Sequence, residues 1–137
     1  MTPIILPITL TIAAAVAVLH IWLAARVSAV RNSQKVSIGD GGNEALIRRM
    51  RAHANYGENM PIVLILLALA ELAGGDPRIL WGAAILFVVA RILHAFGMDQ
   101  PHPSRLRMFG MIGSTLALVV LAGYAVFLLY SHPAALR

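Results

Sequence analysis

The sequence predicts an all-α integral membrane protein, a four-transmembrane-helix up-down bundle that forms one domain over residues 1–137. Hydrophobic residues make up 59% of the chain and charged residues 12%, whereas soluble domains average about 45–50% and about 25%. A spanning helix needs about 20 residues, so four helices with short loops use nearly the whole length. The chain has no cysteine, which excludes disulfides and a protein thiol nucleophile.

The first and last helices are expected over about residues 4–31 and 105–131. Ile4 to Ala25 is uncharged for 22 residues, and Met108 to Tyr130 for 23. Both stretches are long enough to cross a bilayer. Because no positive charge precedes the first stretch, we expect it to be a retained helix rather than a cleaved signal peptide.

The two middle helices are expected to carry charge into the membrane. Only 12 residues separate Glu58 from Glu71, and only 12 separate Arg78 from Arg91. Neither uncharged segment is long enough to cross alone, so both helices must continue through their polar ends. The expected helices cover about residues 43–73 and 77–98.

The tight turn from Gly74 to Pro77 makes the middle helices antiparallel neighbours. Glu58 lies 13 residues before Glu71, and Arg91 lies 14 residues after Pro77, which puts each about 20 Å from the hairpin side. An isolated charge at that depth costs several kcal/mol, so such residues pair with each other or line a wet cavity. We therefore expect Glu58 and Arg91 to share a polar site.

The distribution of lysine and arginine predicts the orientation in the membrane. Nine of these residues lie at one side, against Arg78 and Arg137 at the other. By the positive-inside tendency, the first and third loops are cytoplasmic and both termini are non-cytoplasmic. In a bacterium the membrane would be the inner one, and the polar site opens to the cytosol. The nine are Arg26, Arg31, Lys35, Arg48, Arg49, Arg51, Arg91, Arg105 and Arg107.

Polar residues form a stripe on the second expected helix. Arg51, Asn55 and Glu58 stand at i, i+4 and i+7, which places them on one helix face. Several guanidiniums with one carboxylate fit a small zwitterionic, peptide-like ligand that carries more than one carboxylate. If that ligand carried a thiol, a nearby guanidinium would favour the thiolate. The other candidates are Arg91 and His94 on the third helix and Arg105 and Arg107 at the start of the fourth.

These residues resemble a known family. The resemblance is carried by two segments, RAHANYGENMP at 51–61 and RILHAFG at 91–97, which are similar to segments of the MAPEG family, the membrane-associated proteins in eicosanoid and glutathione metabolism. The pattern Arg-x-x-x-Asn-x-x-Glu-x-x-Pro is its most specific part. Met98 stands where several members have a tyrosine, which favours the microbial branch of microsomal glutathione transferase-like proteins.

The resemblance implies a homotrimer that holds glutathione as a cosubstrate between adjacent subunits. It implies a membrane-bound glutathione transferase, with peroxidase activity as an extension, that adds the glutathione thiolate to hydrophobic small-molecule electrophiles dissolved among membrane lipids. Arg107 is implied as the catalytic residue that stabilises the thiolate, with Arg105 as the alternative alignment. The implied glutathione-binding residues are Arg31 (alternatively Arg26), Arg51, His53, Asn55, Glu58, Arg91 and His94.

The sequence alone is also compatible with two other functions. One is a catalytically silent membrane protein that binds glutathione or lipid with the same polar stripe. The other is a small multidrug exporter, which usually places its essential acid in the first helix, where this chain has none. The excess of arginine also opposes cationic substrates.

Some patterns predict no further chemistry. No metal site is expected, because His94 and His102 bracket a proline-containing loop with Asp99 as the sole nearby carboxylate. No nucleic-acid partner is expected, because the basic residues gather at the ends of apolar segments. Gly110 and Ser114 form a small-x-x-x-small pair, a pattern that is common by chance in apolar sequence.

Overall fold

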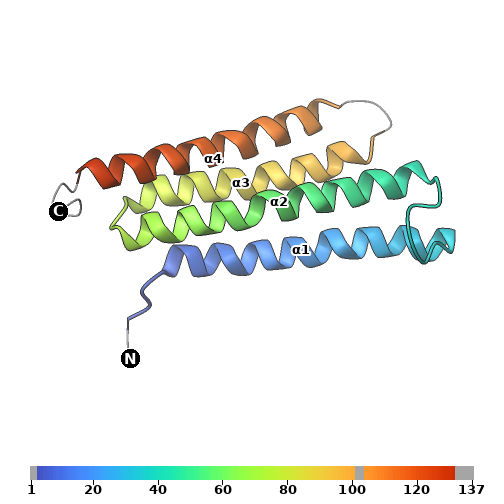
Figure 1. Cartoon of the computed structure of the whole chain (residues 1–137), viewed down its shortest axis with the longest axis horizontal. Coiled ribbons are helices and arrows are strands. Elements are labelled where there is room, and N and C mark those ends of the chain that lie inside the picture. The colour runs from blue at the N-terminus through green and yellow to red at the C-terminus, as the bar shows by residue number, and fades with distance from the viewer. Residues whose placement is uncertain (1–2, 101–103, 132–137) are drawn as a thin grey trace.

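The computed structural model describes residues 3–100 and 104–131 and arranges them as four helices that run alternately up and down (Figure 1). The prediction of an all-α, four-helix chain is confirmed. Helix α1 begins and ends about three residues later than expected, with Pro7 in its first turn, where a residue without an N–H is tolerated. The helices are α1 Pro7–Gln34, α2 Glu44–Leu72, α3 Pro77–Met98 and α4 Arg105–Ser131.

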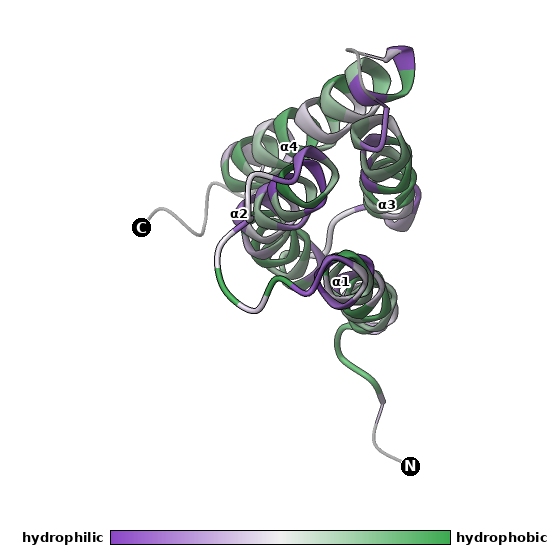
Figure 2. Cartoon of the chain, turned by 90° about the vertical axis from the view of Figure 1, so that its right-hand side faces the viewer, coloured by the Kyte–Doolittle hydropathy of each residue, from purple (hydrophilic) through white to green (hydrophobic). Residues whose placement is uncertain are grey.

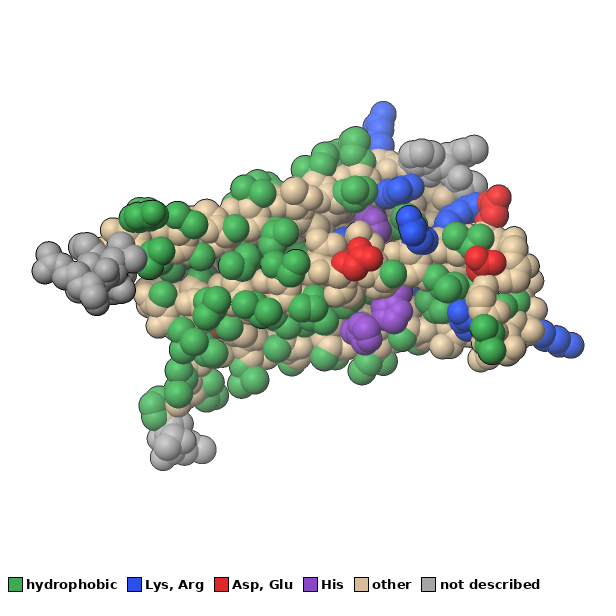
Figure 3. All heavy atoms as spheres, in the orientation of Figure 1, with side chains coloured by type: hydrophobic (Ala, Val, Ile, Leu, Met, Phe, Trp, Pro, Cys, Tyr) green, Lys and Arg blue, Asp and Glu red, His purple; other side chains and the backbone are tan. Residues whose placement is uncertain are grey.

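Three of the helices, α1, α3 and α4, are long and apolar enough to cross a membrane. Helix α2 has 29 residues, but charged residues occupy its first half. On the face shown in Figure 3, charged and histidine side chains gather over the half of the bundle where α1 ends and α2 begins, and the other half is largely apolar. The chain thus has one apolar half and one charged half.

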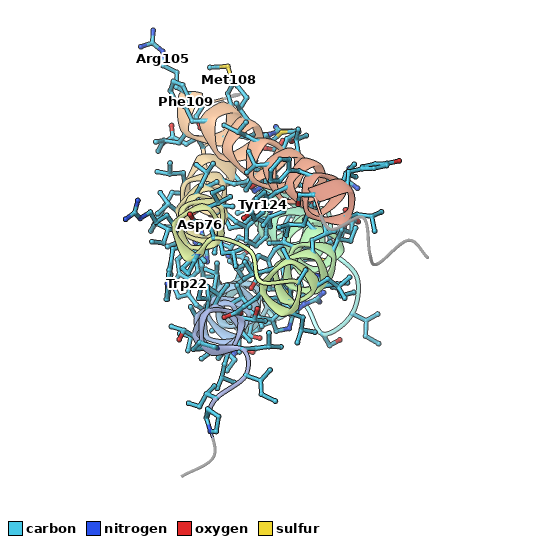
Figure 4. The ribbon with its side chains drawn as sticks, turned by 90° about the vertical axis from the view of Figure 1, so that its left-hand side faces the viewer. Trp22, Asp76, Arg105, Met108, Phe109 and Tyr124 are labelled. Atoms are coloured by element: carbon cyan, nitrogen blue, oxygen red, sulfur yellow. The ribbon has the colours of Figure 1, made fainter. Side chains whose placement is uncertain are left out.

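Helix α4 and helix α1 lie at opposite sides of the bundle, with α2 and α3 between them (Figure 2). Asn43 and Asp76 cap the first turns of α2 and α3 with their side-chain oxygens, as N-cap residues do. The Tyr124 hydroxyl of α4 accepts a hydrogen bond from the Asp76 N–H at 2.6 Å (Figure 4). The hairpin between α2 and α3 is therefore tied to α4.

Side chains from all four helices fill the core. Tyr56, Phe87 and Leu121 are fully buried, and the Tyr56 hydroxyl donates to the Val16 carbonyl oxygen of α1 at 2.5 Å. A buried hydroxyl needs such a partner. This bond sets the position of α1 against α2 next to the polar stripe.

A carboxylate of α2 caps the start of α1 at the apolar end of the bundle. Glu71 accepts hydrogen bonds from the backbone N–H groups of Ile8 at 2.8 Å and Thr9 at 2.7 Å, and from the Thr9 hydroxyl at 2.7 Å. The first N–H groups of a helix have no partner within the helix, and the helix dipole favours an anion there. Since Leu6, the N-cap residue, has no capping side chain, Glu71 takes over this role.

We expect Glu71→Gln to lower the stability of the bundle by about 1–2 kcal/mol, because the amide loses the charge and turns its NH2 group toward a backbone donor. Thermal unfolding in detergent, followed by circular dichroism, measures the change. The matched control is Glu44→Gln, since Glu44 lies in the first turn of its own helix α2 and forms an exposed i,i+4 ion pair with Arg48, worth about 0.3–0.5 kcal/mol. Equal losses in the two variants would contradict a capping role.

Candidate ligand pocket

A pocket of about 180 Å³ lies between α2, α3 and α4 in the charged half of the bundle. The α2 stripe of Arg51, Asn55 and Glu58 forms one wall, because the i, i+4, i+7 spacing aligns these side chains on one face. Helix α3 contributes His94, and α4 contributes Arg107. Three helices therefore bring their predicted polar residues to one place.

The pocket opens on the outer face of the chain. Arg51, Glu58 and Arg107 are exposed and Asn55 is half-buried, whereas His94 is only 4% exposed. Charged residues in a membrane protein face a wet cavity or other protein rather than hydrocarbon. These exposed side chains therefore face either water or another protein chain.

Arg91 lies behind the pocket wall, with 2% of its surface exposed. Its guanidinium donates to Asn55 Oδ1 at 2.9 Å and to Ser114 Oγ at 3.4 Å, and it lies 3.4 Å from His94 Nδ1. Arginine only donates, so the Asn55 atom that it meets is the carbonyl oxygen. The NH2 group of Asn55 is left to donate to a ligand.

Glu58 and Arg91 were expected to share a polar site, but they do not form an ion pair with each other. Among the residues that the structure describes, no ion pair joins Glu58 to Arg91; Glu58 lines the pocket and Arg91 acts on it through Asn55. The Nε of Arg91 is buried without a hydrogen-bond partner in the described chain. A buried positive charge that no carboxylate neutralises favours an anion in the adjoining pocket.

The position of Arg107 depends on a close approach of α4 to α3. A Cβ on Gly97 would lie 2.2 Å from the Arg107 backbone nitrogen, and a Cβ on Gly110 would lie 2.5 Å from the His94 nitrogen. Only glycine permits these approaches. The Ser104 hydroxyl donates to the Gly97 carbonyl oxygen and accepts from the Arg107 N–H, each at 3.2 Å. The first turn of α4 is thereby held against the last turn of α3.

The two candidate arginines of α4 are placed differently. Arg105 is exposed and projects away from the bundle (Figure 4), whereas Arg107 lines the pocket. Two positions along a helix turn the side chain by about 200°, so the two residues cannot share one face. Of the two alternatives, the geometry puts Arg107 in the pocket.

The first-helix arginines lie outside the pocket of their own chain. Arg26 forms an ion pair with Asp99, and Arg31 contacts the Ser37 carbonyl oxygen and the Met50 sulfur, each at 3.4 Å. The physical reason is that α1 packs on α2 and α3 and, over the described residues, does not contact α4. Neither arginine lines the pocket of its own chain, and the expectation that one of them contacts the cosubstrate stays a prediction.

His53 also points away from the pocket. Its Nε2 lies 3.3 Å from Nδ1 of His20 on α1, because a position two residues from both Arg51 and Asn55 falls on the opposite side of the helix. His20 is exposed and forms this pair rather than packing into apolar surroundings. Within the part of the chain that the structure describes, neither ring belongs to a group of three or more potential metal ligands. His102 lies outside the described residues.

The sequence singled out Met98 but not Ala54 or Met111, which also line the pocket, and it did not predict the contact of Ser114 with Arg91. Helical spacing could have identified the two methionines of the lining. Met98 lies four residues after His94, and Met111 four residues after Arg107, so each methionine shares a face with a predicted polar residue. Both line the pocket.

Comparisons with known proteins show which family the chain is similar to. The sequence model of the MAPEG family matches residues 9–127. The chain is 28% identical over 92 residues to the inner membrane protein YecN of Escherichia coli strain K12, a match that covers 67% of this chain and 70% of that protein. The identity and coverage are the same for YecN of Escherichia coli O6:H1. Since the family match spans most of all four helices, the chain belongs to the MAPEG family of membrane proteins.

Proposed function

We propose that this protein is a membrane-bound glutathione transferase, which holds glutathione in the pocket and adds its thiolate to hydrophobic electrophiles from the membrane. The observation that carries the proposal is the convergence of Arg51, Asn55 and Glu58 of α2 with Arg107 of α4 around one pocket. Membership of the MAPEG family supports it.

The groups of glutathione match the groups of the pocket. Glutathione has two carboxylates, one ammonium and one thiol; Arg51 and the Asn55 amide are donors for a carboxylate, and Glu58 is an acceptor for the ammonium. Arg107, on the α4 side, is then the guanidinium that meets the thiol. Lowering a thiol pKa by two units takes about 2.7 kcal/mol of preferential interaction with the thiolate, which one well-placed guanidinium supplies.

The chemistry follows from the thiolate. The thiol proton leaves to water, the sulfur attacks an electrophilic carbon to form a C–S bond, and the electron pair leaves with the displaced group. With a lipid hydroperoxide as the electrophile, two glutathiones are oxidised to the disulfide while the hydroperoxide is reduced to an alcohol and water. Arg107 stabilises the anionic sulfur in both reactions.

A homotrimer would complete the site. The pocket volume of about 180 Å³ is below the about 300–1,000 Å³ of typical small-molecule sites, and its charged lining is exposed. An adjacent copy packed on this face would enclose the ligand and would bring its own Arg31 and His53, which lie outside the pocket of their own chain. We propose that glutathione lies between subunits in this way.

We propose the orientation that the positive charges favour, with the charged half of the bundle at the cytosolic side and both termini at the other side. Helix α2 crosses the membrane with the other three, because α1 and α3 run in the same direction (Figure 1) and the chain must return between them. The glutathione site then opens to the cytosol.

A glutathione-binding protein without turnover is the second candidate. Met98 lines the pocket and supplies no hydroxyl donor. Tight glutathione binding without conjugation of a generic aromatic halide would favour this candidate, and measurable conjugation would exclude it.

We expect Arg51→Ala to weaken glutathione binding at least about tenfold, because a charge-assisted hydrogen bond to a carboxylate is worth about 1.5–3 kcal/mol and about 1.4 kcal/mol is tenfold in affinity. Titration calorimetry of the detergent-solubilised protein measures the affinity. The matched control is Arg48→Ala, one turn earlier on α2 and paired with Glu44 outside the pocket. If Arg51→Ala bound glutathione as tightly as Arg48→Ala, the pocket assignment would be wrong.

A further inference from the structure

A second groove, of about 420 Å³, lies between α1 and α3 and has an almost wholly apolar lining. Val18 and Trp22 form part of its α1 wall, and Val88 and Phe96 form part of its α3 wall. Val18 is 68% exposed and Phe96 is 49% exposed. The groove is therefore open along the side of the bundle, and none of its lining residues lines the ligand pocket.

The dimensions of the groove suit a hydrocarbon chain. Val88 and Phe96 are eight residues apart on α3, a distance of about 12 Å along the helix axis. One leaflet of the hydrocarbon core is about 15 Å thick. A groove of this length that runs along the helices is parallel to the acyl chains of the surrounding lipid.

Arg26 lies beside one end of the groove, next to Trp22 and Phe96, and forms a charged cluster there with Asp99 and Arg49. The Arg26 guanidinium lies 4.6 Å from the ring centroid of Trp22 and 5.7 Å from that of Phe96, so it covers the aromatic end of the groove. Arg26 and Arg49 both form ion pairs with the carboxylate of Asp99. Two guanidiniums share one carboxylate, which leaves one uncompensated positive charge.

Arg49 is placed to meet a ligand at this end. Its Nε lies 3.2 Å from Asp99 Oδ1, and one terminal nitrogen donates to the Arg26 carbonyl oxygen at 3.0 Å. The side chain is 29% exposed, compared with 12% for Arg26. A guanidinium has five N–H donors in a fork that matches phosphate oxygens, so Arg49 retains donors for an anion.

We propose that the groove between α1 and α3 binds an acyl chain of an anionic phospholipid, whose phosphate is held by Arg49 beside Arg26. An apolar channel that ends at an excess positive charge matches a ligand with a hydrocarbon tail and an anionic head. Basic sites between membrane helices bind anionic headgroups for the same reason. The lipid site is separate from the ligand pocket and does not depend on glutathione binding.

Native mass spectrometry of the full chain, with dioleoylphosphatidylglycerol or dioleoylphosphatidylcholine added to the detergent, tests the proposal. The acyl chains are identical, so only the headgroup charge differs. We expect the wild type to retain phosphatidylglycerol about fivefold better, the equivalent of about 1 kcal/mol for one arginine. Arg49→Gln should abolish this preference. Arg48→Gln should keep it, because the neighbouring Arg48 is paired with Glu44 instead.

A second pair of variants tests the groove itself. Val18→Trp fills the groove from an exposed position and should reduce retention of phosphatidylglycerol several-fold, whereas Leu10→Trp, also exposed on α1 but outside the groove, should not. Inorganic phosphate should fail to displace the bound lipid.

The proposal would be overturned by equal retention of the two lipids by the wild type, by equal effects of Arg48→Gln and Arg49→Gln, or by displacement of the lipid by inorganic phosphate. Unchanged lipid binding by Val18→Trp would show that a second copy of the chain or another element covers the groove, which would also overturn it. None of these measurements uses glutathione, so their outcome is independent of the proposed transferase activity.

Discussion

Replacing Arg107 with alanine should lower kcat/KM for conjugation of glutathione with a generic aromatic halide about a hundredfold, because a thiol pKa shift of two units corresponds to about 2.7 kcal/mol. Arg107 lines the pocket, and in the proposed function it is the guanidinium that stabilises the thiolate, so its loss should raise the thiol pKa. Steady-state assays of the purified protein in detergent measure the rate. The ultraviolet absorbance of the glutathione thiolate should disappear in parallel.

Arg105→Ala is the matched control, since Arg105 lies two residues away on the same helix and projects from the bundle (Figure 4). We expect its activity and thiolate absorbance to equal those of the wild type. Arg107→Lys should restore part of the thiolate signal, because the point charge remains although the planar fork is lost. Full thiolate absorbance in Arg107→Ala would contradict a role of Arg107 in stabilising the thiolate. A loss seen only in Arg105→Ala would assign that role to Arg105.

The sequence predicted the parts of this site that depend on one helix alone. Hydropathy located four helices, and the spacing of Arg51, Asn55 and Glu58 placed them on one wall of the pocket, as the structure shows. Both properties follow from the helical repeat and need no knowledge of the neighbouring helices. The choice between Arg105 and Arg107 was left open, because it depends on how the loop before α4 joins α3.

The relation of Glu58 to Arg91 shows where sequence reasoning stops. Counting residues gave both side chains a similar depth, but depth does not determine the rotation of a helix about its axis. In the structure Arg91 turns inward to Asn55 and Ser114, whereas Glu58 is exposed. Which residues of two helices face each other is decided by packing between the helices.

Arg31 and His53 show a second limit. Sequence similarity associates them with the cosubstrate, but the fold of one chain directs them to other partners. A sequence carries no direct record of which subunit supplies each residue of a shared site. The trimer that would reunite these residues with the pocket stays a prediction.

Gly110 belongs to a small-x-x-x-small pattern that predicted no contact in the sequence, yet it lies at a close contact between α3 and α4. We expect Gly110→Ala to destabilise the bundle by up to about 3 kcal/mol, the cost of overpacking a tight contact. The new Cβ would lie 2.5 Å from the His94 nitrogen and 2.7 Å from the Ala90 carbonyl oxygen. Both are backbone atoms, so the clash is relieved only by moving α4 away from α3.

Gly123→Ala on the same helix gives the decisive comparison, because a Cβ there meets nothing within 4 Å. Alanine is favoured over glycine in a helix by about 0.8–1.0 kcal/mol, so this control should leave thermal stability in detergent unchanged or raise it. Movement of α4 in Gly110→Ala also displaces Arg107, and we expect conjugation to fall in that variant even below its unfolding temperature. A Gly110→Ala protein as stable and as active as Gly123→Ala would show that the helices tolerate separation at this contact, and that Arg107 is positioned by other means.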